Sequence, residues 1–256
     1  MESLLDDPWV LGLLTALLLA GVVEAGCRAA VPLCIQKDED RKGQTVAIRD
    51  GLFILLGLLF GFTLALAGTR YAERRSLLID EATSIGTTYL RAETLPDTIR
   101  DQSQQMLKQY VDARLDLDNA GLDDDRRREA AEHAEQLQLR LWKGVIELTK
   151  SDRSAVTAAY MNSLNQTIDL HEKRISALEN RVPRPIWLLI FCVSIIAVFT
   201  RGLTLARRFW LMFLLAPLTT ALVIAFIADV DTPSSGLIQL DQRPMLRLKA
   251  EINSHP

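Results

Sequence analysis

The stretch GLFILLGLLFGFTLALAG at residues 51–68 decides the fold of this 256-residue chain, because it carries no charged side chain. A helix rises about 1.5 Å per residue, so about 20 apolar residues cross the hydrocarbon core of a bilayer. Uncharged runs also occur at residues 9–23, 185–200 and 209–228. The sequence therefore predicts four transmembrane helices, at about 8–26, 51–68, 186–206 and 209–228.

The charged residues gather in the block between the second and third predicted spans. Residues 69–185 hold 18 Lys/Arg and 20 Asp/Glu, whereas the formal net charge of the whole chain is only −3. This block is predicted to lie outside the membrane. The strong net basicity that is typical of nucleic-acid-binding proteins is absent, so no nucleic-acid partner is expected.

The extramembrane block is expected to be helical. It contains only three glycines and three prolines, which leaves few positions for turns between strands. Apolar residues at 78, 82, 85 and 89 continue the second span as an amphipathic helix to about Ala92, and Pro96 opens the next helix. The predicted fold is all-α: a transmembrane hairpin at 1–68, a helical extramembrane domain at 69–185 inserted between the second and third spans, a second hairpin at 186–228, and a polar tail at 229–256.

The second half of the block shows a coiled-coil pattern. Apolar positions follow a 3-4 spacing from Met161 to Val182, with His171 on the same row. The partner helix is expected to be residues 125–149 of the same chain, in an antiparallel hairpin. The alternative is that identical seam helices of two subunits meet. His171 is interpreted as a structural seam residue, with a proton-sensitive role as the alternative. Asp123, Asp124 and Asp125 are expected to mark the start of the preceding helix.

The distribution of charges does not decide on which side of the membrane the extramembrane block lies. The two short connections, 27–50 and 201–208, hold eight Lys/Arg, which favours an outward-facing block by the positive-inside rule. Basic residues also flank the membrane ends of the block itself, and counting them removes the asymmetry. Glu24 and Arg201 lie near predicted span ends and are interpreted as residues of the membrane edge, with a water-filled pathway as the alternative.

Motifs for catalysis and for metal binding are absent from the sequence. There is no phosphate-binding loop, nucleophile elbow or H-E-x-x-H motif, and the three cysteines, Cys27, Cys34 and Cys192, form no C-x-x-C pair. Glu129 and His133 stand four residues apart, but one such pair is close to chance in a charged helix. We predict that the chain is not an enzyme and carries no cofactor or metal.

Small residues line one face of the second span. Gly57, Gly61, Ala65 and Gly68 recur at a 4-4-3 spacing, which lets another helix backbone approach closely. This face is expected to pack within the subunit or, alternatively, against neighbouring subunits. In the second case the row of Leu55 and Phe62 faces elsewhere, where an apolar lining of a central pathway is compatible with gating by dewetting.

Several motifs together resemble the bacterial family of bestrophin-like membrane proteins. The most specific run lies between Glu81 and Pro96 and includes Gly86, Thr87, Tyr89, Leu90 and Arg91; the segments 61–63, 70–75 and 110–114 add to it. The tail segments at 229–238 and 244–245 also agree. The resemblance covers most of the chain.

The resemblance implies a function for the predicted spans. Bestrophins are pentameric anion channels with four spans, a helical cytosolic domain and a calcium-responsive acidic clasp, and Asp229 and Asp231 stand near the clasp position. The leading hypothesis is therefore a homo-oligomeric, multi-pass protein of the bacterial inner membrane, in contact with lipid, that conducts small anions. The alternative is a non-conducting, membrane-anchored helical protein for interaction or sensing.

Overall fold

The computed structural model describes residues 7–33, 35, 38–121, 123–205, 210–232 and 236–254. Cys34, the loop around 206–209 and the centre of the tail motif at 233–235 lie outside the described residues. The described residues form eight helices and no strand, which confirms the all-α prediction. In chain order the helices are α2 (Pro8–Ala30), α3 (Glu39–Ala92), α4 (Asp97–Asn119), α5 (Asp124–Ser151), α6 (Ala155–Glu179), α7 (Arg184–Thr204), α8 (Trp210–Asp231) and α9 (Arg243–Ser254).

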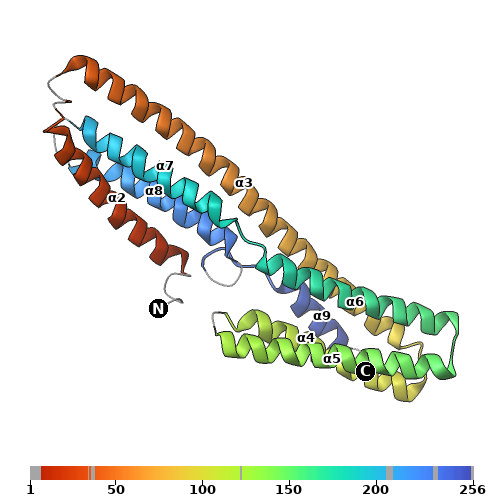
Figure 1. Ribbon diagram of the computed structural model, residues 1–256. Helices are drawn as coiled ribbons and strands as arrows, with labels where there is room; N and C mark the ends of the chain where they lie inside the picture. The colour runs from red at the N-terminus through yellow and green to blue at the C-terminus, as the bar shows by residue number, and fades with distance from the viewer. Residues whose placement is uncertain are drawn as a thin grey trace. The chain divides into compact units, whose positions relative to one another are not determined.

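The helices divide into two compact units (Figure 1). Met1–Tyr71 and Arg181–Ile238 form one, which we call the span unit. Ala72–Asn180 and Gln239–Pro256 form the other, the polar unit. The last 18 residues, 239–256, are thus part of the polar unit together with the helices between the second and third apolar runs.

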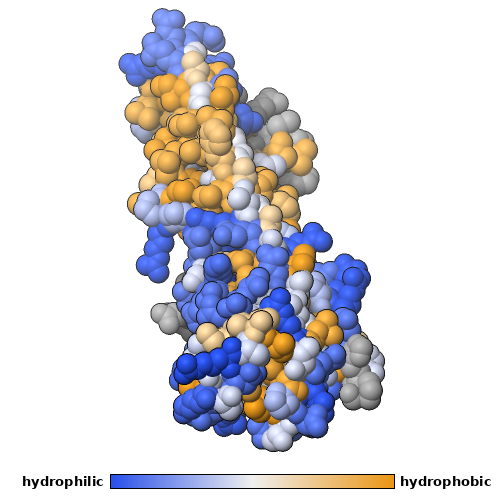
Figure 2. Space-filling model, turned by 90° about the vertical axis from the view of Figure 1, so that its right-hand side faces the viewer, coloured by the Kyte–Doolittle hydropathy of each residue, from blue (hydrophilic) through white to orange (hydrophobic). Residues whose placement is uncertain are grey.

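The span unit contains four helices that are long and apolar enough to cross a membrane, as predicted. They are α2, the first part of α3, α7 and α8. On the face that Figure 2 shows, apolar side chains cover most of the span unit between hydrophilic ends, whereas hydrophilic side chains predominate on the polar unit. Because a water-soluble surface avoids large apolar patches, the surface of the span unit is suited to lipid.

Glycines bring the helices of the span unit into close contact. A Cβ on Gly26 of α2 would lie 2.3 Å from the carbonyl oxygen of Phe199 in α7, and one on Gly202 of α7 would lie 2.3 Å from the carbonyl oxygen of Val23. A Cβ on Gly12 would lie 2.7 Å from that of Ala225 in α8. Side chains at these three glycines would therefore push α2 away from its neighbours.

Helix α3 is longer than the sequence indicates. It ends at Ala92, as predicted, because nothing interrupts it before Pro96. Its start at Glu39 precedes the apolar run at residue 51 by 12 residues. Glu39 and Asp40 occupy its first turn, where negative charge stabilises the N-terminal end of a helix.

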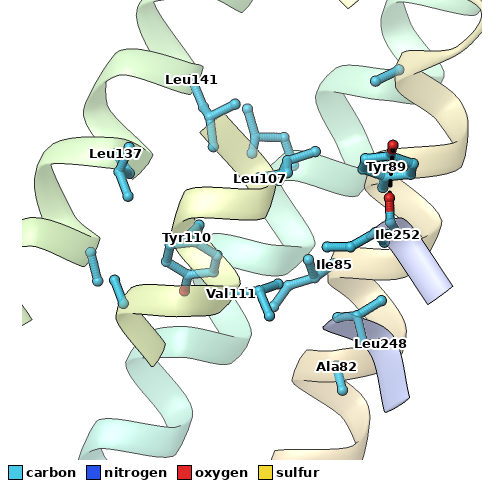
Figure 3. Packing of buried hydrophobic residues seen from close by; sticks show 14 of the residues in the cluster. Ala82, Ile85, Tyr89, Leu107, Tyr110, Val111, Leu137, Leu141, Leu248 and Ile252 are labelled. Atoms are coloured by element: carbon cyan, nitrogen blue, oxygen red, sulfur yellow. Dashed lines mark hydrogen bonds between the residues drawn. The ribbon is translucent and has the colours of Figure 1, made fainter. Parts of the chain in front are cut away.

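The polar unit is built on four helical segments joined by short turns: the end of α3, α4, α5 and α6. Short connections place successive helices antiparallel. Their shared core includes Ile85, Leu107, Tyr110 and Leu137, and α9 closes it with Leu248 and other apolar side chains (Figure 3).

Helix α6 packs on the core through part of the predicted seam and through a polar row beside it. Leu164 and His171 of the seam are buried, and Met161 and Ile168 are partly buried against the core. Ser163, Thr167 and Arg174, which are not on the seam, are buried as well. The Thr167 hydroxyl lies 2.9 Å from that of Ser84 on α3. The buried face of α6 is thus broader than the predicted seam, because α6 also makes polar contacts with α3, which apolar periodicity does not detect.

Candidate functional site

The first part of α3 uses only one face for packing within the chain. Leu56 and Ala67 are buried, and Leu56 packs with Val193 and Ala197 of α7. Gly57, Gly61 and Ala65 are exposed and Gly68 is half-buried; a Cβ added to any of these glycines would meet nothing within 4 Å. Within the part of the chain that the structure describes, the small-residue face therefore has no partner.

The apolar row beside this face is also open. The exposed fraction is 43% for Leu55 and 67% for Phe62. Leu58 lies one turn from both and is 54% exposed. The structure thus leaves two neighbouring surfaces of the same helix uncovered, one of small residues and one of large apolar residues.

The predicted membrane-edge charges lie at the end of the span unit where α2 and α7 end and α3 begins. Glu24 pairs with Arg28 in the next turn of α2, at 2.8 Å. Arg201 is half-buried near Arg49 and Asp50 of α3, and the Arg49 guanidinium donates to the Thr204 hydroxyl of α7 at 3.1 Å. The Arg49 hydrogen bond therefore joins α3 to the end of α7.

Asp229 and Asp231, the candidate clasp residues, are buried with exposed fractions of 1% and 5%. The Asp229 carboxylate accepts hydrogen bonds from the backbone N–H groups of Leu237 and Ile238, at 2.8 and 3.0 Å. Both oxygens of Asp231 lie 3.0 Å from the backbone nitrogen of Val182. Within the residues that the structure describes, these carboxylates hold backbone segments at the end of α8, and no group of three or more acidic, His or Cys side chains could hold a metal.

A buried network of charged side chains lies in the core of the polar unit. Its centre is Glu81, on α3 beyond the apolar run at 51–68, with no exposed surface. The Arg114 Nε on α4 lies 2.8 Å from the Glu81 carboxylate, and the Arg174 Nη1 on α6 donates to it at 2.6 Å. Arg174 also donates to Asp118 at 2.7 Å. The positive charges of the two arginines are therefore balanced by the negative charges of the two acids inside the bundle.

Neutral groups complete this network. The Tyr110 hydroxyl donates to Glu81 at 3.2 Å, lies 2.9 Å from Nδ1 of His171, and accepts a hydrogen bond from Gln138 on α5 at 3.0 Å. His171 is only 3% exposed. One residue of α3 is thereby connected to α4, α5 and α6.

The network determines the ionisation of its members. Burial alone raises the pKa of Glu81, but Arg114, His171 and Arg174 outweigh it and hold that pKa well below its usual range. Burial, with the charge of Glu81 beside it, raises the pKa of Tyr110 far above the ordinary value for tyrosine. Glu81 is therefore ionised and Tyr110 neutral near pH 7, the forms that the hydrogen bonds require.

The other residues of the family motif build the interface between α3 and α9. The Tyr89 hydroxyl donates to the carbonyl oxygen of Ile252 at 3.3 Å (Figure 3). A Cβ on Gly86 would lie 3.1 Å from Leu248. Thr87 and Leu90 are exposed beside this contact.

The end of the motif joins the helices at the α3–α4 turn. The Arg91 guanidinium donates to the carbonyl oxygen of Ala159 on α6 at 2.9 Å, and Pro96 precedes α4 as its N-cap residue. Asp123 caps α5, as expected, by accepting from the backbone N–H of Arg126 at 3.2 Å. Glu129 and His133 are exposed on α5.

The family of this chain is shown by a comparison of its sequence with known protein families. A family model described as the Bestrophin-like domain matches residues 35–245. The chain belongs to the bestrophin-like family. No curated protein sequence gives a significant match. The family assignment confirms the resemblance found in the sequence.

Solved structures agree with this bestrophin-like fold. A mutant of a bacterial bestrophin homologue from Klebsiella pneumoniae is similar with a TM-score of 0.68 and 13% identity, over 95% of this chain and 99% of that chain. Another structure of a bacterial bestrophin homologue from the same organism gives a TM-score of 0.67 and 14% identity over the same shares. Identities this low show a common fold and do not show that this bestrophin-like protein shares the function of those structures.

Proposed function

We propose that this protein is a homo-oligomeric anion channel of the bacterial inner membrane, in which the apolar part of α3 lines the pathway. The residues between the second and third spans form its extramembrane domain. The bestrophin resemblance supports anions as the conducted species and a ring as the assembly.

The observation that carries the proposal is the uncovered surface of α3. Gly12, Gly26 and Gly202, which pack between helices of the span unit, all contact another helix, whereas Gly57 and Gly61 contact none among the described residues. A helix that repeats small residues without using them inside its own chain is suited to close approach by a neighbouring copy. In a closed ring each α3 then packs on the next through this face.

The same assembly gives the large apolar side chains a role. If the small-residue face is covered by a neighbour, the row of Leu55, Leu58 and Phe62 is directed elsewhere and is available to line the axis. Apolar rings conduct when they are wide enough to stay wet and close by dewetting, so this lining needs no charged residue.

Assembly is tested by one glycine variant and its matched control. Gly61→Leu is expected to break the oligomer into smaller species, whereas Gly21→Leu is not, because Gly21 is exposed on α2 with nothing within 4 Å of its Cβ position. Native mass spectrometry in detergent measures the subunit number. A wild-type monomer or dimer would favour the non-conducting, membrane-anchored alternative.

Conduction is tested by halide flux into liposomes. Phe62→Ala is expected to raise the flux several-fold by widening the constriction, and Leu218→Ala on α8, where Leu218 is 53% exposed, is expected to leave it unchanged. Absence of flux for the wild type and for Phe62→Ala, with the oligomer intact, would refute the channel.

The orientation is tested in intact cells. A cysteine introduced at Asn119, which is exposed at the end of α4, is expected to resist a membrane-impermeant thiol reagent until the cells are opened. Labelling in intact cells would place the extramembrane domain outside.

A further inference from the structure

The polar unit carries two exposed apolar surfaces. The first is a groove between α3 and α9, about 330 Å³ in volume, which we call the α3–α9 groove. Ile79 and Leu90 on α3 line it, and their exposed fractions are 42% and 51%. Part of the family motif thus lines an open groove.

The second surface is on α5, and we call it the α5 surface. It consists of Glu135, Leu139, Trp142 and Ile146, which recur at a 4-3-4 spacing on one side of the helix. Leu139 is 61% and Ile146 44% exposed. A hollow of about 350 Å³ beside Leu139 and Trp142 adjoins Ile168 of α6. Apolar patches of this kind outside a membrane mark interaction surfaces.

The two surfaces lie on different helices. The helix α9 packs on α3 and α4, where Lys249 pairs with Asp112 of α4 at 2.8 Å. The hollow of the α5 surface opens between α5 and α6. The groove is thus lined by α3 and α9 and the hollow by α5 and α6, so the two surfaces share no helix.

Charged residues give each surface a direction. Along the groove, Arg247 precedes Glu251, and α9 runs parallel to α3 because Leu248 contacts Gly86 and Ile252 contacts Tyr89. Along the α5 surface an acid, Glu135, precedes a base, Lys143, and both are exposed. Parallel docking of α5 on α3 therefore directs the acidic end of the α5 surface, at Glu135, towards Arg247 and the basic end, at Lys143, towards Glu251.

The symmetry of a ring requires the same direction. Successive helices in the core alternate, so α3 and α5 of one chain run the same way. Rotation about an axis along α3 preserves this direction in the next copy. A cyclic assembly uses two different, complementary surfaces on each subunit, and these two meet that requirement in shape, polarity and direction.

We propose that the α5 surface of one subunit docks in the α3–α9 groove of the next. The partner is a second copy of this chain, and the proposal rests on the ring assembly proposed above. The groove lies on the polar part of α3, so this contact joins the extramembrane domains independently of the glycine face in the membrane.

Cross-linking tests this contact. Two cysteines, Leu90→Cys and Leu139→Cys, are introduced together into a variant in which Cys27, Cys34 and Cys192 are replaced by Ser. A short bifunctional maleimide is expected to give a ladder of covalent oligomers, because docking brings the two sites of neighbouring chains together.

The control pair keeps Leu90→Cys and moves the second cysteine to Arg140. Arg140 is exposed on α5, about 130° around the helix from the α5 surface, and this pair is expected to give no ladder. An oligomer in native mass spectrometry without a ladder for the Leu90 and Leu139 pair would overturn this contact while leaving the channel proposal intact. Equal ladders for both pairs would also overturn it, and a monomer would overturn both proposals.

Discussion

Glu81→Gln is the substitution for which the structure predicts the largest loss of stability. Glutamine has nearly the same shape but no charge, so Arg114 and Arg174, which are 0% and 1% exposed, lose the carboxylate between them. Removing one partner of a buried ion pair costs about 3–5 kcal/mol, because the other charge stays buried without compensation. For a chain of this size, that corresponds to a melting temperature lower by roughly 10 °C.

The control is Glu172→Gln, which removes an acid from α6 next to His171. Glu172 is exposed, and loss of an exposed charge changes stability by less than about 0.5 kcal/mol. Thermal unfolding in detergent, followed by circular dichroism, measures both variants. A Glu81→Gln protein that melts within about 2 °C of the Glu172→Gln protein would refute the argument that the network stabilises the polar unit.

The pH dependence gives the same prediction an independent readout. Because the folded-state pKa of Glu81 is held below its unfolded value, its contribution is fully present above the unfolded pKa of about 4.3 and is lost as the pH falls towards the folded pKa. The stability difference between wild type and Glu81→Gln should therefore shrink by about 1.4 kcal/mol per pH unit below about pH 4. A constant difference between pH 5 and pH 3 would contradict it.

Three further changes test other contacts. Gly202→Val should lower the melting temperature by several degrees, because its Cβ would lie 2.3 Å from a carbonyl oxygen of α2, whereas Gly21→Ala should not lower it. Asp229→Ala should speed hydrogen exchange at the amides of 237 and 238, which lose their acceptor; unchanged exchange would show that the carboxylate does not hold this segment. Arg247→Glu and Glu135→Arg should each weaken the oligomer in dilution experiments, and the double variant should restore it.

Length and charge patterning were sufficient to predict the four apolar helices and the helical block between them, but not α9, which lies in the segment expected to be a polar tail. Four uncharged runs gave the four apolar helices, and the absence of proline before Pro96 gave the end of α3. The start of α3 at Glu39 was missed because residues 39–50 are polar and continue the helix without an apolar pattern. Apolar periodicity detects only helix faces that become buried. A helix boundary that depends on helix propensity alone therefore leaves no such pattern in the sequence.

The candidate site was predictable only in part. Spacing identified the small-residue face of α3, but it could not show whether another helix of the same chain covers it. The glycines that pack between the apolar helices, Gly12, Gly26 and Gly202, lie on α2 and α7, where no repeated spacing marks them. Their role follows from the crossing of two helices, a tertiary feature that a single segment does not encode.

The buried network has a signal in the sequence, namely charged residues that stand on apolar rows of three helices. Glu81 falls on the row of Leu78 and Ile85 in α3, Arg114 on that of Leu107 and Val111 in α4, and Arg174 on that of Leu170 and Ala177 in α6; all of these residues are buried. A charge on an apolar row is costly unless an opposite charge meets it. One acid and two bases on three such rows therefore predict that the rows meet, and Asp118 supplies the fourth charge that neutralises them. This rule assigns partners among helices, which apolar periodicity cannot do, because any apolar row can pack against any other.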